Sequence, residues 1–85
     1  MVDYKLIVSN AVKADLRSIE NHSLGRILDA IRSLAVDPLP SGCRKLKGAQ
    51  SSYRIRVGDY RIIYDVDAAN RAVTIFHVRH RRDAY

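Results

Sequence analysis

Residues 52–66 read SYRIRVGDYRIIYDV, and this stretch decides the fold that the sequence predicts. Residues 52–57 and 60–66 each alternate between two kinds of side chain, as β-strands with one buried face do. Between them lies Gly58-Asp59, which is typical of the two-residue turn of a β-hairpin. The stretch therefore predicts an antiparallel hairpin, and the hairpin fixes which side chains share a face.

The two faces of this hairpin differ in chemistry. One is tyrosine and aliphatic and is expected to form core, through Tyr53, Ile55, Val57, Tyr60, Ile62, Tyr64 and Val66. The other carries Arg54, Arg56 and Arg61, and a two-residue turn sets Arg56 directly opposite Arg61. Like charges repel at such a position, whereas adjacent guanidinium groups suit a phosphate. Neutralisation by Asp65 or by a bound partner is the alternative interpretation.

Before the hairpin, the pattern indicates one strand and two helices. Residues 4–8 alternate as a strand, with Tyr4, Leu6 and Val8 on one face. Ser9 or Asn10 can cap a helix that ends near Asn21. A second helix is expected after a cap at Ser23, with an aliphatic stripe of Leu24, Ile27, Leu28, Ile31 and Leu34.

Proline and turn residues set the remaining boundaries. Pro38 ends the second helix by Val36 or Asp37. Residues 67–71 form a turn, and residues 72–78 are β-branched and apolar enough to be the last strand. We therefore expect one α+β domain over residues 1–85: an N-terminal strand, a helical hairpin, then a three-stranded antiparallel meander. The helices should pack on one face of the sheet and leave the other open.

Charge is distributed unevenly along the chain. Residues 1–41 hold five basic and five acidic side chains, whereas residues 42–85 hold ten basic and four acidic ones. A local surplus of this kind favours a polyanionic partner, although a solvated basic surface would look the same.

The single cysteine and three scattered histidines do not predict a metal or cofactor site. No signal peptide or membrane span is recognisable, which favours a cytoplasmic protein.

The last nine residues add cations and an aromatic ring. Residues 77–85 contain three arginines, His77, His80 and the terminal Tyr85. Basic side chains interleaved with an aromatic suit single-stranded RNA, whose phosphates bind the cations while a base stacks on the ring. Terminal charge runs are more often simply solvated.

Three segments together resemble the RelE/ParE toxin superfamily of type II toxin–antitoxin systems. They are Arg44-Lys45-Leu46-Lys47-Gly48, residues 53–64, and His80-Arg81-Arg82-Asp83-Ala84-Tyr85. The resemblance implies a ribosome-dependent endoribonuclease, or mRNA interferase, that cuts mRNA in the 30S decoding site. It also implies a RelB-like antitoxin as partner, with a toxin–antitoxin complex that binds its own promoter DNA.

The resemblance also carries roles to individual positions. Arg54, Arg56, Arg61, Arg81 and Tyr85 match catalytic positions, and Lys45, Lys47 and His80 are expected to contact RNA. Attack of a 2′-hydroxyl on the adjacent phosphate needs neither a metal nor a protein nucleophile, only charge stabilisation. Several family members have lysine at the positions of Arg54 and Arg56. Arginine, with a pKa of about 12.5 or more, is a poor general base, so His80 becomes the candidate for proton transfer.

Two other readings of the sequence stay open. A ParE-like toxin shares this fold but inhibits DNA gyrase and cleaves no RNA, so it is a binding module. The combination of arginines with a terminal tyrosine favours the nuclease. A protein that binds an antitoxin but has lost activity is the third reading.

Overall fold

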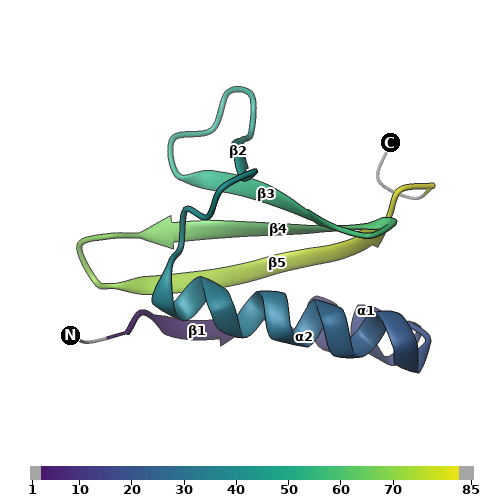
Figure 1. Cartoon of the computed structure of the whole chain (residues 1–85). Coiled ribbons are helices and arrows are strands. Elements are labelled where there is room, and N and C mark those ends of the chain that lie inside the picture. Colours follow the sequence, from purple (N-terminus) through teal and green to yellow (C-terminus); the bar gives the residue numbers. More distant parts are fainter. Residues whose placement is uncertain (1–2, 83–85) are drawn as a thin grey trace.

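Two helices and a five-stranded sheet make up the part of the chain that the computed structural model describes, residues 3–82. Both helices lie on one side of the sheet, alongside its β1 and β5 edge (Figure 1). The predicted α+β class is therefore confirmed. The elements are β1 (Lys5–Val8), α1 (Asn10–Arg17), α2 (Asn21–Val36), β2 (Arg44–Lys45), β3 (Ser52–Val57), β4 (Tyr60–Asp67) and β5 (Ala72–His80).

The sheet contains more than the predicted meander. Its strand order is β1-β5-β4-β3-β2, and the β3, β4 and β5 strands pair antiparallel as expected. The first strand, β1, pairs with the last one, β5, in parallel. Parallel neighbours need a long connection, which the helices and the meander provide here. At the opposite edge, the two-residue strand β2 pairs antiparallel with β3, an element that the sequence did not predict.

The hairpin has the predicted register. Val57 pairs with Tyr60 and Arg56 with Arg61, so Gly58 and Asp59 form a two-residue turn. Gly58 has φ +59°, whereas Asp59 is not among the residues with positive φ. A positive φ at the first central residue alone is the pattern of a type II′ turn, whose twist matches that of the strands it joins.

The helix boundaries agree with the sequence in part. Ser9 caps α1, since its Oγ accepts a hydrogen bond from the Val12 N–H at 3.2 Å. The first helix ends at Arg17 and the second begins at Asn21, so the predicted end near Asn21 and the predicted cap at Ser23 are both wrong. Ser23 lies in the first turn, where its hydroxyl donates to Oε1 of Glu20 at 3.0 Å. The helix ends at Val36, as expected ahead of a proline.

The core lies between the helices and one face of the sheet. Tyr64 is fully buried there, and its hydroxyl donates to the Pro38 carbonyl at 2.8 Å. That bond satisfies the buried hydroxyl and ties the segment after α2 to the centre of the sheet. The buried residues are Val12, Ile19, Ile27, Ile31, Leu34, Ile62, Tyr64, Val73, Ile75 and Val78.

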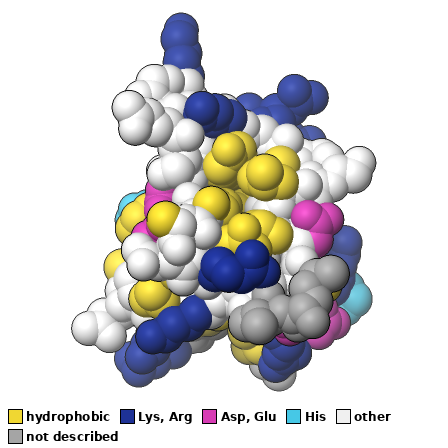
Figure 2. All heavy atoms as spheres, turned by 90° about the vertical axis from the view of Figure 1, so that its left-hand side faces the viewer, with side chains coloured by type: hydrophobic (Ala, Val, Ile, Leu, Met, Phe, Trp, Pro, Cys, Tyr) yellow, Lys and Arg dark blue, Asp and Glu magenta, His cyan; other side chains and the backbone are white. Residues whose placement is uncertain are grey.

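Some large hydrophobic side chains remain exposed. Val36 and Leu39, at the end of α2 and just beyond it, are 66% and 50% exposed. Figure 2 shows this end of the molecule, with hydrophobic side chains gathered among lysines and arginines. None of the helices in residues 3–82 has the length and hydropathy needed to cross a membrane.

Candidate nucleic-acid interface

Arginine side chains from four neighbouring strands share the face of the sheet that the helices leave open. Arg56 and Arg61 are cross-strand partners on β3 and β4, as predicted, and Arg61 pairs in turn with Arg79 on β5. At the β2 edge, Arg44 pairs with Arg54. Directly paired residues project from the same face, so the sheet register itself gathers these cations.

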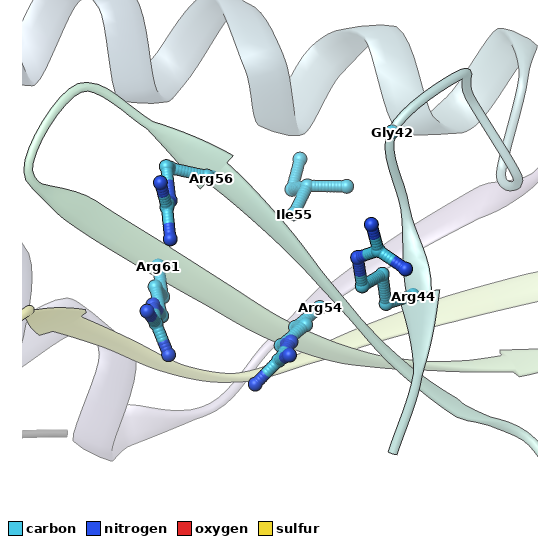
Figure 3. Close-up of a pocket in the computed structure, with 6 residues that line it drawn as sticks. All are labelled: Gly42, Arg44, Arg54, Ile55, Arg56 and Arg61. Atoms are coloured by element: carbon cyan, nitrogen blue, oxygen red, sulfur yellow. The ribbon is translucent and has the colours of Figure 1, made fainter. Parts of the chain in front are cut away.

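Two shallow depressions adjoin on this surface. The first, of about 300 Å³, is lined by Gly42, Arg44, Arg54, Ile55, Arg56 and Arg61 (Figure 3). The second, of about 370 Å³, is lined by Arg56, Gly58, Asp59, Tyr60, Arg61, Arg81 and Arg82. Arg56 and Arg61 line both of them. The pair therefore separates two cationic depressions, one toward β2 and the other toward the end of β5.

The arginines of β2 and β3 have no carboxylate partner among the residues that the structure describes. Within residues 3–82, no carboxylate comes within ion-pair distance of Arg44, Arg54 or Arg56. Asp65 instead accepts a hydrogen bond from the Ser51 hydroxyl, so its proposed role as the neutralising group finds no support. Partial desolvation, and then the charges of Arg54 and Arg56, lower the pKa of Arg61. The surface is therefore set up to bind an anion.

One carboxylate does approach the second depression. The Arg81 Nε lies 3.9 Å from Oδ1 of Asp59 in the hairpin turn, and the Arg81 N–H donates to the Asp59 carbonyl at 2.8 Å. Both side chains are about two-thirds exposed. Because exposed ion pairs at such distances are weak, this contact leaves Arg81 available to a stronger anion.

Two of the three predicted RNA-contacting residues, His80 and Lys45, do not join the arginines. His80 pairs with Tyr60, one position out of phase with Arg61, and its ring packs edge-on against Tyr60 with the ring centroids 5.1 Å apart. It therefore projects on the helix side of the sheet. Lys45 pairs with Tyr53 and projects on that side too, while Lys47 lies beyond the end of β2. The catalytic assignment of Tyr85 falls outside the described residues.

Sequence reasoning missed Arg44, and it did not assign Arg79 or Arg82 to the site either. The basic run at residues 44–47 was visible, but alternation could not be assigned within so short a stretch. Only the pairing of β2 with β3 shows that Arg44, rather than its neighbour Lys45, joins the arginines. Both are exposed, so burial gives no further signal.

Phosphate binding is the chemistry that this surface favours. Guanidinium groups remain charged at all physiological pH values and can bind a phosphate with two parallel hydrogen bonds. Across residues 3–82, no three His, Cys, Asp or Glu side chains are gathered in a way that could hold a metal ion. The arginines can stabilise negative charge, and any proton transfer would need other groups.

Comparison with known proteins gives consistent results over nearly the whole chain. The family described as "ParE toxin of type II toxin-antitoxin system, parDE" matches residues 6–85. The chain is similar to the putative toxin RelE1 of Methanocaldococcus jannaschii, with 27% identity over 96% of this chain and 94% of that protein. It is also similar to toxin RelG of Mycobacterium tuberculosis, with 26% identity over 96% of this chain and 95% of that protein.

Solved structures agree with this relationship. The fold resembles that in the archaeal RelE-RelB complex from Pyrococcus horikoshii, with a TM-score of 0.84 and 29% identity over 96% of this chain and 99% of that chain. It also resembles that in the RelB-RelE antitoxin-toxin complex from Methanococcus jannaschii, with a TM-score of 0.78 and 28% identity over 93% of this chain and 94% of that chain.

Proposed function

This chain belongs to the RelE/ParE superfamily of toxins from type II toxin–antitoxin systems, and we propose that it is an endoribonuclease that cleaves mRNA in the ribosomal decoding site. The observation that carries the proposal is the pair of adjoining cationic depressions on the open face. A surface of this kind suits a single-stranded polyanion, whose phosphates contact cations in succession. Action on ribosome-bound mRNA would place the protein in the cytoplasm.

The proposed reaction needs no nucleophile from the protein. The 2′-oxygen of the substrate forms a bond to the adjacent phosphorus, and the bond from phosphorus to the 5′-oxygen breaks. The proton of the 2′-hydroxyl passes to water, and the leaving 5′-oxygen takes up a proton from water. The products are a 2′,3′-cyclic phosphate and a 5′-hydroxyl. Arg56, Arg61 and Arg81 would stabilise the additional charge on the phosphate oxygens.

Arginines can supply much of the acceleration in such a reaction. Removing one preorganised contact to a developing anion typically costs about 10² to 10³ in rate. The mutual repulsion of Arg56 and Arg61 is relieved when a phosphate binds, so the pair favours the bound anion electrostatically. Proton transfer is not assigned to His80 in this proposal, because its side chain lies on the helix side of the sheet.

A RelB-like antitoxin is the proposed partner. The solved relatives from P. horikoshii and M. jannaschii are complexes with RelB. An acidic antitoxin segment over the open face would neutralise the arginines and exclude RNA. The face also offers an apolar contact at Ile7, which is 41% exposed and pairs with Thr74 of β5. Such a complex would be the species that binds its own promoter DNA.

Inhibition of DNA gyrase is the second candidate, because the matching family is described as ParE toxins. The decisive experiment combines two assays on the same purified protein. Primer extension on translating ribosomes should show new mRNA 5′ ends, while gyrase supercoiling should remain unaffected. Inhibited gyrase with intact mRNA would reject the nuclease in favour of the gyrase inhibitor. Inactivity in both assays would favour a protein that only binds its antitoxin.

A further inference from the structure

We propose that Arg44 and Arg54 form a second phosphate subsite, which binds the phosphate next to the one being cleaved. The proposal rests on the proposed RNase function and extends it to the length of RNA that the toxin holds. It assigns Arg44 as a substrate-positioning residue, and it gives Arg54 a role in binding in place of the catalytic role that the resemblance implies. The proposal is based on the division of the cationic surface into two depressions that share Arg56 and Arg61.

The first depression has the composition of a phosphate site. Arg44 and Arg54 are direct cross-strand partners, so their side chains project from the same face at neighbouring positions. No carboxylate among residues 3–82 forms an ion pair with either of them. Figure 3 shows both side chains beside the hairpin, with Arg44 coming from the separate β2 segment. Two guanidinium groups can therefore approach one phosphate from different strands.

The β2 segment is anchored, so Arg44 is not carried by a free loop. The Tyr64 hydroxyl holds the Pro38 carbonyl at 2.8 Å, and the Leu46 N–H donates to the Ser52 carbonyl at 2.9 Å. Gly42, which precedes the strand, has φ +92°, a conformation that L side chains rarely adopt. These constraints fix where Arg44 enters the sheet, which lowers the cost of ordering it on binding.

The spacing along β3 suits one nucleotide step. Arg54 and Arg56 are two residues apart on the same face, which separates their Cα atoms by about 6.6 Å. This is comparable with the separation of successive phosphates in an extended strand of RNA. An RNA that runs along β3 would therefore place one phosphate in each depression. The cleaved phosphate belongs beside Arg81, because Arg81 lines only the second depression.

The expected contribution of Arg44 is binding rather than chemistry. A contact to a phosphate that does not react is made equally in the ground state and in the transition state. Loss of a charged hydrogen-bonding contact should therefore weaken RNA binding about tenfold and leave the maximal cleavage rate unchanged. Loss of a catalytic arginine would instead lower the maximal rate.

The test uses single-turnover cleavage of mRNA on programmed ribosomes, with Arg44→Ala, Arg44→Lys and wild type. The matched control is Lys13→Ala, which removes one charge from α1 on the helix side of the sheet. A second set of mRNAs carries one neutral methylphosphonate linkage, placed on either side of the cleaved bond.

We expect Arg44→Ala to raise the half-saturating toxin concentration about tenfold. Arg44→Lys should give a value between those of Arg44→Ala and wild type, and the control should match wild type. A neutral linkage on one side of the cut should abolish the difference between Arg44→Ala and wild type.

Two outcomes would overturn the subsite. One is a lower maximal rate in Arg44→Ala with unchanged half-saturation; the other is a difference that persists with the neutral linkage on either side. A parallel measurement separates this failure from that of the proposed function. The salt dependence of binding to an uncleavable 2′-O-methyl RNA should decrease in slope by about 0.7 in Arg44→Ala. If wild type cuts no mRNA, that decrease still supports the phosphate contact, and an unchanged slope rejects it.

Discussion

Arg56 and Arg61 are direct partners across the β3–β4 hairpin, so the structure holds two like charges together on an open face. The Gly58-Asp59 turn fixes the register that brings them together. Their repulsion is expected to cost the free protein about 0.2 to 1 kcal/mol, the usual size of a cross-strand pair effect. A bound anion would offset this repulsion, so the arrangement suits an anion-binding site.

The first prediction concerns Arg56→Thr, which removes the repulsion and retains strand propensity. The variant should melt at the wild-type temperature or up to about 4 to 8 °C higher. It should also lose most of its RNA cleavage and its inhibition of growth, as expected where a site is held against its own repulsion. Calorimetric melting and primer extension on the same preparation test both halves. Arg56→Lys, which keeps the charge, should melt as wild type does.

A different result would change the role of this residue. Ready unfolding of Arg56→Thr would mean that the guanidinium group stabilises the fold. Normal melting together with full toxicity would remove Arg56 from the active site and favour the gyrase-inhibiting branch of the superfamily.

The second prediction concerns Asp59, whose carboxylate competes with RNA for Arg81. Asp59→Asn removes this charge and keeps a residue that turns accept. Because an exposed pair contributes about 0.2 to 1 kcal/mol, RNA affinity should rise about 1.4- to fivefold at low salt. The gain should fade as salt screens the charges. Binding to 2′-O-methyl RNA across a salt series tests this, and an affinity that falls would show that Asp59 holds Arg81 in its productive position.

The third prediction concerns the buried Tyr64 and alkaline pH. Burial, and to a lesser extent the neighbouring Cys43, raise the pKa of Tyr64 above its ordinary value. In the unfolded chain a tyrosine ionises near pH 10. A raised pKa in the folded state means that the stabilisation is complete below about pH 10 and is lost as the pH rises above that value.

The variant Tyr64→Phe removes both the titration and the hydrogen bond to Pro38. It should be less stable than wild type by about 0.5 to 1.5 kcal/mol at pH 8. Wild type should then lose stability more steeply above pH 10, so the gap between the two proteins should narrow. Urea unfolding at pH 8, 9, 10 and 11 measures the gap, and parallel curves would contradict the assignment.

How much the sequence could predict depends on whether a feature is local. Alternation and a two-residue turn define the hairpin by themselves, so the facing of Arg56 and Arg61 followed from the sequence. The β2 strand is only two residues long and is held by contacts to distant residues such as Tyr64, so Arg44 could not be assigned. The residues around β5 show the same limit: a register shift in its pairing with β4, near Phe76, cannot be read from alternation.

The fourth prediction concerns the products of cleavage. Attack by the substrate's own 2′-hydroxyl should continue in excess EDTA on a short RNA at high toxin concentration. It should leave a 2′,3′-cyclic phosphate and a 5′-hydroxyl, which mass spectrometry distinguishes from other ends. Fragments with a 3′-hydroxyl and a 5′-phosphate would indicate a metal-activated water and would overturn the proposed mechanism.

The fifth prediction concerns the antitoxin. We expect a short acidic segment that is disordered alone and folds over the open face of the sheet, because its charge complements the arginines there. Replacing Arg54, Arg56, Arg61 and Arg81 with alanine should weaken antitoxin binding on the order of 10²-fold, since four partly exposed charge contacts are lost together. The control removes charges that lie on the helices, by changing Lys13, Arg17 and Arg32 to alanine, and should retain tight binding. Calorimetry at two salt concentrations measures the affinity of the antitoxin for both variants. Tight binding that survives the first set of changes would mean that apolar contacts, such as the one that Ile7 offers, hold the antitoxin instead.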